Sequence, residues 1–242
     1  MDFKEIFGFI KSKANPKCSF VVVAAGNSER MGNDKMLIEL SGKPVIVRTL
    51  EALEKSDYCD EVILVTREDK LESMAALVKE YNLGKVAKVV AGGLTRSESC
   101  LAGVCAAKKN AKLIAIHDGA RPFISEKLIK NCVFGAVEKK AAVPGIKIND
   151  TIKATESGII CGDIDRDATV RIQTPQIFDA DLIKGALSYV VSKNIAVTDD
   201  SSAVECLGVK AKVVEGDPDN IKLTTPRDVQ LAEMILSQRS ST

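Results

Sequence analysis

The sequence predicts an α/β fold in which helices cover both faces of a mostly parallel, twisted sheet. Three observations predict it. Short apolar runs rich in β-branched residues recur along the chain, segments with helical spacing lie between them, and several of those segments carry helix-start signals. Strands that are buried on both faces and separated by helices form parallel sheets with right-handed crossovers. The chain of 242 residues is compatible with a single domain.

Six apolar runs are the predicted strands, because valine, isoleucine and other strand-favouring residues dominate them. They span residues 19–24, 61–66, 85–90, 112–117, 141–146 and 210–215. In sheets of this kind, ligands bind beyond the carboxyl ends of the strands. We therefore expect the functional residues just after these runs.

Seven segments between the strands have the apolar spacing of helices. They lie near residues 44–55, 68–81, 95–109, 125–139, 179–192, 199–207 and 225–237. Four start signals support them: Pro44 at a first-turn position, Thr66 and Ser125 as N-cap residues, and the pair Thr225-Pro226 before the last helix.

One region breaks the alternation of strands and helices. Residues 147–173 contain short alternating patterns on either side of Ser157-Gly158, which predicts a β-hairpin arm. A long arm has little core of its own, so burial against a second subunit would stabilise it. We therefore expect one domain over 1–242 that dimerises through this arm.

Composition excludes several classes of partner. Formal net charge is +1, from 34 basic and 33 acidic residues, so no global field attracts nucleic acid or a membrane surface. Aromatic residues make up 4% and Trp is absent, which disfavours platforms for stacked bases. No apolar stretch approaches the roughly 18–20 residues that span a bilayer.

The cysteines and the N-terminus favour a cytoplasmic protein. The seven cysteines are odd in number and scattered, without a CxxC pair, and one histidine cannot complete a zinc set. They fit small apolar fillers in a reducing compartment. Residues 2–13 carry apolar side chains at helical spacing but lack the apolar core and cleavage site of a secretory signal. We expect a short extra helix there.

The first strand ends in a turn of small residues that is suited to phosphate. Ala24, Ala25 and Gly26 allow backbone N–H groups to approach a phosphate closely. Arg30 and Lys35 follow, one a forked donor and the other a point charge, and together they can gather the charge of a triphosphate.

The two common glycine-rich phosphate motifs do not fit this turn. The dinucleotide pattern GxGxxG would need glycine at Ser28, and a P-loop would need lysine after Gly32, where Asn33 stands. The stretch is therefore a different phosphate-binding turn or a plain structural turn. The two nearby cations favour the first interpretation.

Polar clusters follow the other strands as well. AGGLTRSES places two glycines before Arg96 and Ser99 at a helix start, and HDGARPF places Asp118 where it could meet Mg²⁺ or a sugar hydroxyl. In the same motif Arg121 suits an anion, and we expect a structural or orienting role for His117. Further clusters are RIQTPQIF (171–178), TDDSSAVE (198–205) and GDPDNIKLTTPRD (216–228), which carries Lys222.

Taken together, these motifs resemble the cytidylyltransferases that act on 2-C-methyl-D-erythritol 4-phosphate in the non-mevalonate isoprenoid pathway. The resemblance covers residues 19–237 and rests on AAGNSERMG, GGLTRSES, HDGARPF, QTPQIF, TDDSSAVE and VEGDPDNIKLTTPRD. It implies a Rossmann-like sheet of the nucleotide-diphospho-sugar transferase type. It also implies CTP and a polyol phosphate as substrates, Mg²⁺ as cofactor and a homodimer that exchanges its β-arms.

The resemblance also implies roles for individual residues. Cations that hold the triphosphate would be Arg30 and Lys35. Groups that enclose the cytidine would be Ala24, Ala25, Gly26, Gly93, Arg96 and Ser99, with Asp118 beside the ribose and the metal. The methylerythritol phosphate would be held by Arg121, Arg166 and Lys222, with Thr174 and Thr198 as polar lining. Thr151 and Arg166, on the arm, would reach the partner's active site.

The chain departs from the family pattern in the 27–36 loop and at one further position. Serine stands at 28 where glycine is common, and Asn33-Asp34-Lys35-Met36 replaces a longer loop that ends in Pro-Lys-Gln. Leu94 occupies a position that is usually acidic. The departures bear on the geometry of Lys35 and on the details of nucleotide recognition.

The inferred chemistry needs no general base. A phosphate monoester has a second pKa of about 6, so its oxygen is already anionic when it attacks the α-phosphorus of CTP. Positioned cations and Mg²⁺ reduce the repulsion between the two anionic substrates. Three alternatives stay open: a cytidylyltransferase for ribitol 5-phosphate, a nucleotide-dependent dehydrogenase, and a CTP-binding protein without turnover.

Overall fold

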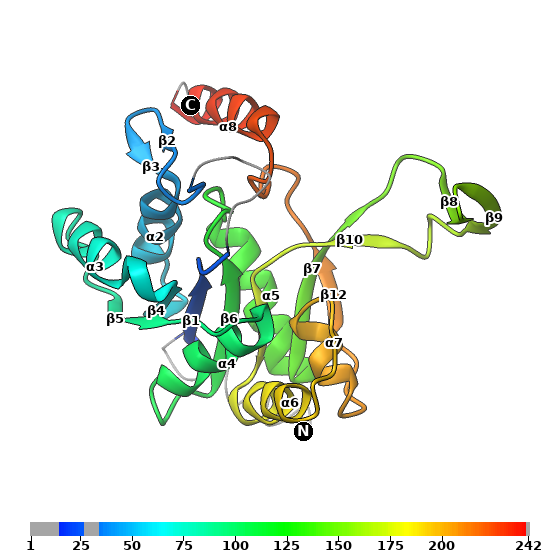
Figure 1. Ribbon diagram of the computed structural model, residues 1–242, viewed down its shortest axis with the longest axis horizontal. Coiled ribbons are helices and arrows are strands. Elements are labelled where there is room, and N and C mark those ends of the chain that lie inside the picture. Colours follow the sequence, from blue (N-terminus) through cyan, green and yellow to red (C-terminus); the bar gives the residue numbers. More distant parts are fainter. Residues whose placement is uncertain (1–14, 27–33, 241–242) are drawn as a thin grey trace.

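The structure is a computed structural model that describes residues 15–26 and 34–240. It shows a mainly parallel central sheet between two layers of helices, which confirms the predicted fold class (Figure 1). The N-terminal helix predicted at about 2–13 lies outside the described residues, as does Arg30.

All six predicted strands form, within two residues of their expected bounds. They are β1 (Cys18–Val23), β4 (Cys59–Thr66), β5 (Val86–Ala91), β6 (Leu113–Asp118), β7 (Ala141–Lys147) and β12 (Lys212–Glu215). Two further strands join this sheet: β10 (Val170–Ile172), which lies within the stretch 147–173 predicted as the arm, and β11 (Gln176–Asp179), which was not predicted. The sheet order is β10-β7-β11-β6-β1-β4-β5, with β12 beside β7. β11 runs antiparallel between β6 and β7, and it is the main departure from an all-parallel core.

The predicted helices also form. They are α2 (Val45–Lys55), α3 (Leu71–Glu80), α4 (Arg96–Ala106), α5 (Glu126–Lys139), α6 (Ala180–Ser192), α7 (Asp200–Glu205) and α8 (Pro226–Ser240). Ser125 caps α5 as predicted, since its side chain accepts the Leu128 N–H. The Thr66 prediction was wrong: this residue ends β4, and a short 3₁₀ turn (η2, Glu68–Lys70) precedes α3. Pro44 immediately precedes α2.

The two faces of the sheet have separate cores. In β1, Phe20 and Val22 face the layer that contains α2 and α5, whereas Val21 faces α4 and α6. This alternation is the side-chain period of a strand that is buried on both sides. Gly103 of α4 lets that helix approach the sheet, because a Cβ there would lie 2.3 Å from Cγ1 of Val21.

A long hairpin projects from the body of the molecule (Figure 1). It contains β8 (Ile152–Glu156) and β9 (Ile159–Ile164), which pair with each other in a separate antiparallel sheet. Ser157 and Gly158 form the turn with φ angles of 50° and 82°, as in the left-handed two-residue turns that favour hairpins. A second short hairpin, β2 (Glu39–Leu40) with β3 (Lys43–Pro44), precedes α2.

None of the helices in the described part of the chain is both long and apolar enough to cross a membrane.

Candidate active site

A cavity of about 260 Å³ lies at the carboxyl ends of β1, β5 and β6, where the strand pattern places a ligand. Val23 of β1 and Asp118 of β6 are register partners there. The cavity is lined by Val23, Ala25, Gly26, Lys35, Met36, Gly93, Leu94, Thr95, Arg96, Ser99, Asp118, Ala120 and Lys222. These residues come from five separate stretches of sequence.

Eight residues that the sequence predicted for the site line this cavity. They are Ala25, Gly26, Lys35, Gly93, Arg96, Ser99, Asp118 and Lys222. Ala24 is buried beside them. Among the described residues, no atom lies within 4 Å of a Cβ added to Gly26.

The loop between β5 and α4 is fixed by a capping box. Thr95 accepts the Glu98 N–H, and the Glu98 side chain accepts the Thr95 N–H in return. Ser99 Oγ accepts the Gly93 N–H at 3.1 Å. Gly93 must be glycine for packing, because a Cβ there would lie 2.3 Å from Cβ of Glu98. This loop therefore presents its backbone to the cavity in one fixed arrangement.

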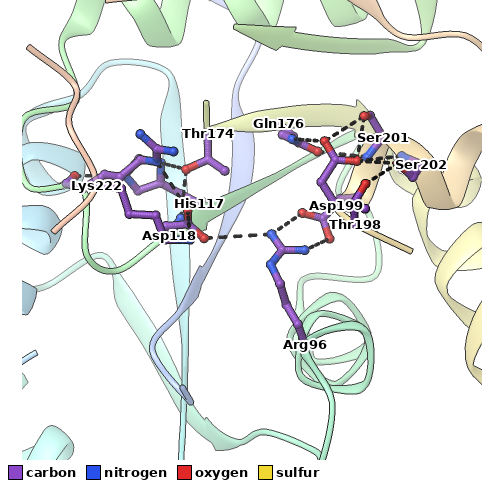
Figure 2. Close-up of polar contacts among 12 residues, drawn as sticks. Arg96, His117, Asp118, Thr174, Gln176, Thr198, Asp199, Ser201, Ser202 and Lys222 are labelled. Carbon is purple, nitrogen blue, oxygen red and sulfur yellow. Dashed lines mark hydrogen bonds and ion pairs between the residues drawn. The ribbon is translucent and has the colours of Figure 1, made fainter. Parts of the chain in front are cut away.

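Asp118 is the electrostatic centre of the cavity. Its Oδ2 lies 2.9 Å from Nζ of Lys222, and its Oδ1 lies 4.0 Å from Arg96 (Figure 2). The same Oδ2 lies 3.3 Å from Nε of Arg121. Burial alone would raise the pKa of this carboxyl, but the three cations outweigh it and hold the pKa well below its usual range. Asp118 is therefore a carboxylate at neutral pH.

Asp200 holds Arg96 and was missed by the sequence analysis. The two guanidinium nitrogens of Arg96 donate to the two carboxylate oxygens of Asp200 at 2.8 and 2.6 Å, a bidentate pair in which Asp200 is buried. Burial would lower the pKa of Arg96, but Asp200 reverses this and raises it. The TDDSSAVE motif drew attention to this stretch, but it did not indicate which residues pair with Asp199 or Asp200.

The start of α7, which carries Asp200, is anchored to β11. Gln176 donates its amide N–H to Asp199 at 2.8 Å and accepts the Ser201 N–H at 2.9 Å (Figure 2). Asp199 also caps α7 by accepting the Ser202 N–H. Thr198, predicted as lining, is exposed, and its hydroxyl lies 3.1 Å from that of Ser202.

Four other predicted residues lie outside the cavity lining. Arg121 is buried and approaches Asp118 from outside the cavity. Thr174 is buried 3.0 Å from the Asp118 N–H. Thr151 and Arg166 belong to the projecting hairpin region and are exposed, and Arg166 donates to the Asn149 carbonyl at 3.0 Å. Within one chain, the structure does not bring these last two to the cavity.

The described residues contain no group of three or more His, Cys, Asp or Glu side chains that could hold a metal ion. Asp118 is thus a single carboxylate rather than part of a protein cage. Mg²⁺ is commonly bound through one or two carboxylates together with the phosphates of a substrate. The donor set therefore fits a metal that arrives with a nucleotide.

His117 gives the folded state a testable pH dependence. Burial lowers its pKa to about 4, below the ordinary value of about 6.5, so the unfolded chain takes up this proton first. The contribution of the neutral His117 to the free energy of unfolding is complete above pH 6.5 and is lost as the pH falls toward 4. We expect the unfolding free energy to fall by about 2 kcal/mol between pH 7.5 and pH 5. Urea unfolding without nucleotide or Mg²⁺ measures it, and equal values at the two pH values would contradict the prediction.

Comparison with known proteins identifies the family of this chain. Residues 18–238 match the family model described as IspD, 2-C-methyl-D-erythritol 4-phosphate cytidylyltransferase. The chain belongs to this cytidylyltransferase family. The match contains the whole cavity lining and the projecting hairpin.

Named members of the cytidylyltransferase family align with nearly the whole chain. The enzyme of Halalkalibacterium halodurans is 42% identical over 223 residues, which cover 91% of this chain and 97% of the relative. The enzyme of Bacillus licheniformis is 40% identical, covering 89% and 94%. Both are named 2-C-methyl-D-erythritol 4-phosphate cytidylyltransferase.

Crystal structures of cytidylyltransferases have the same fold. The 4-diphosphocytidyl-2C-methyl-D-erythritol synthase of Anaerococcus prevotii superposes with a TM-score of 0.82 at 32% identity, covering 92% of this chain and 99% of that one. The Thermus thermophilus 2-C-methyl-D-erythritol 4-phosphate cytidylyltransferase gives 0.73 at 28% identity, covering 90% and 98%. This chain is therefore an enzyme of the nucleotidyltransferase class.

Proposed function

We propose that this enzyme transfers the cytidylyl group of CTP to 2-C-methyl-D-erythritol 4-phosphate in non-mevalonate isoprenoid synthesis. The products are 4-diphosphocytidyl-2-C-methyl-D-erythritol and pyrophosphate. The observation that carries this proposal is the cavity around Asp118, Arg96, Lys35 and Lys222 in a chain that matches the family over residues 18–238.

The cavity suits a displacement at phosphorus. A phosphate oxygen of the polyol substrate attacks the α-phosphorus of CTP, and the bond from that phosphorus to the oxygen bridging toward the β-phosphate breaks. The attacking oxygen is already anionic, so the residues need to neutralise and align charge rather than remove a proton. Lys35 lines the cavity and would meet the triphosphate, together with Arg30, which lies outside the described residues. Lys222 also lines the cavity and would meet the phosphate of the polyol.

The nucleotide would be held at the turn after β1 and the loop before α4. Gly26, Gly93, Ser99 and Arg96 line the cavity, and their backbone and polar groups would enclose the cytidine. Asp118 would hold Mg²⁺ together with the phosphates of CTP. The metal supplies charge neutralisation at those phosphates when it is bound.

The test is pyrophosphate release from CTP and Mg²⁺, measured separately with 2-C-methyl-D-erythritol 4-phosphate and with ribitol 5-phosphate. We expect release with the first substrate only. Release with ribitol 5-phosphate alone would contradict the proposed substrate and show that the enzyme activates a different polyol phosphate. CTP binding without release in either reaction would mean a nucleotide-binding protein without turnover.

We also propose that the enzyme is a homodimer in which the projecting hairpin reaches the partner subunit. Isoleucines stand exposed on it: Ile159 is 73% and Ile160 is 63% exposed. Burying them against a second subunit would stabilise the hairpin, and Thr151 and Arg166 could then contribute to the partner's site.

Replacing both Ile159 and Ile160 by serine is therefore expected to shift the protein from dimer to monomer in light scattering at micromolar concentration. The same double change at Leu231 and Met234, which are exposed on α8, serves as a control that should leave the dimer intact. A wild-type protein that is monomeric at working concentration would contradict the dimer itself.

A cytoplasmic location completes the proposal. All seven cysteines lie within the described residues and are free thiols, and four of them are buried. Reduced cysteines are typical of the cytosol. Fractionation of the producing cells would test it, and recovery outside the cytosolic fraction would contradict it.

A further inference from the structure

A buried polar cluster lies directly behind Asp118. It consists of His117, Thr174 and Asn220, which are 0%, 4% and 0% exposed, and is called the polar node below. The three residues come from the end of β6, the segment before β11 and the loop before α8. The cavity and the node are adjacent, because Asp118 follows His117 in the chain.

The hydrogen bonds of the node determine where its hydrogens lie. Nε2 of His117 lies 3.2 Å from the Arg121 carbonyl, which can only accept, so Nε2 carries a hydrogen. The ring is fully buried, and its two nitrogens face a carbonyl and a hydroxyl rather than a carboxylate, so the neutral form is expected. Nδ1 is then an acceptor, and the Thr174 hydroxyl at 3.0 Å must donate to it (Figure 2).

The hydroxyl oxygen and the backbone carbonyl of Thr174 also have protein partners. Its hydroxyl oxygen accepts the Asp118 N–H at 3.0 Å, and its backbone carbonyl accepts the Asn220 side-chain N–H at 2.8 Å. The backbone carbonyl of Asn220 in turn accepts a guanidinium N–H of Arg121 at 2.8 Å. The node thus connects the segments that carry Asp118, Arg121 and Lys222.

We propose that His117 and Thr174 are positioning residues: the Thr174 hydroxyl donates to His117 rather than to substrate, and the pair fixes Asp118 at the cavity wall and Arg121 behind it. The orienting role expected for His117 from the sequence thereby gains a partner, whereas Thr174 supports the cavity wall instead of lining the cavity. The expected effect of the His117–Thr174 pair on turnover rests on the proposed function, but the hydrogen-bond geometry of the pair does not.

Histidine NMR tests the geometry without any activity. His117 is the only histidine of the chain, so protein labelled with ¹⁵N-histidine gives the signals of one assigned ring. At pH 7.5 we expect a neutral ring with its hydrogen on Nε2 and a hydrogen-bonded, unprotonated Nδ1. The pattern should persist with saturating 2-C-methyl-D-erythritol 4-phosphate. A hydrogen on Nδ1, a charged ring, or loss of the Nδ1 hydrogen bond on addition of substrate would overturn the proposal.

Two substitutions of Thr174 test whether the His117–Thr174 pair affects turnover. Thr174→Val keeps the shape but removes both hydrogen bonds, whereas Thr174→Ser keeps the hydroxyl. We expect kcat to fall about tenfold to a hundredfold in Thr174→Val, since small misplacements of reacting groups have effects of this size. Thr174→Ser should stay within about threefold of the parent, with the Nδ1 hydrogen bond retained.

The kinetic pattern separates positioning from direct contact. A rise in KM for the polyol phosphate alone in Thr174→Val, with kcat unchanged, would show that Thr174 binds substrate and would overturn the proposal. Unchanged kinetics in Thr174→Val would overturn it as well. If Thr174→Val does not fold, the wild-type spectrum still decides the geometry. If the wild type releases no pyrophosphate, the proposed function fails while the spectrum still tests the node.

Discussion

Replacement of Lys35 by alanine is expected to lower kcat at least about a hundredfold while leaving the fold intact. Lys35 lines the cavity beside the turn after β1, and its side chain is only partly buried. A cation aimed at the charge that develops around phosphorus contributes in the transition state more than in the ground state. Its removal should therefore reduce turnover far more than it changes the melting temperature. Pyrophosphate release and thermal melts of the same preparations measure the two effects.

Lys127→Ala is the matched control for Lys35→Ala. The Lys127 side chain is 78% exposed and lies 3.8 Å from Glu215, away from the cavity, so neither turnover nor melting should change. Turnover of Lys35→Ala within about tenfold of the parent, which is about 1.4 kcal/mol, would remove Lys35 from the catalytic assignment. The sequence supports the same expectation for Arg30→Ala.

Replacement of Asp118 by asparagine is expected to lower kcat/KM at least about a hundredfold and also to destabilise the protein. The amide keeps the size of the side chain but leaves Lys222 and Arg121 without their counter-charge, whereas Arg96 keeps its pair with Asp200. Removing one partner of a buried ionic group typically costs about 3–5 kcal/mol. Urea unfolding should therefore separate this variant from Lys35→Ala, for which only turnover falls.

A second substitution tests the cause of the instability. Because Asp118→Asn leaves unpaired cations, adding Lys222→Met should recover part of the lost unfolding free energy while leaving turnover low. Asp181→Asn, an exposed carboxylate at the start of α6, is the control and should behave like the parent. If Asp118→Asn unfolds at the same urea concentration as the parent, the carboxylate is not the counter-charge that stabilises this cluster.

The sequence predicted the scaffold and much of the cavity because both depend on local patterns. Apolar runs rich in β-branched residues located six strands, and the rule for parallel sheets placed the site at their carboxyl ends. Gly26, Gly93 and Asp118 were found because each lies within three residues of the end of a predicted strand. Lys35 was found as a cation that follows the turn after the first strand, and Lys222 was found within a later polar cluster; both line the same cavity.

The unpredicted features depend on pairings between distant segments. β11 is only four residues long and follows a polar stretch, so its period was too short to detect, yet it occupies the middle of the sheet. Its position brings Gln176 to the start of α7 and so places Asp200 beside Arg96, 104 residues away in sequence. The sequence around a buried carboxylate does not reveal the residue that pairs with it. The pairing depends on which helix ends the fold brings next to each other.

The sequence by itself determined the α/β class, the edge of the sheet that holds the site, and the chemical character of its residues. The tertiary structure decided which of those residues face the cavity and which support it. Thr174 shows the difference: its motif suggested a lining residue, but folding buries its hydroxyl between His117 and the Asp118 N–H. A side chain's chemistry is fixed by its residue type, whereas its role depends on the donors and acceptors that folding places within hydrogen-bonding distance.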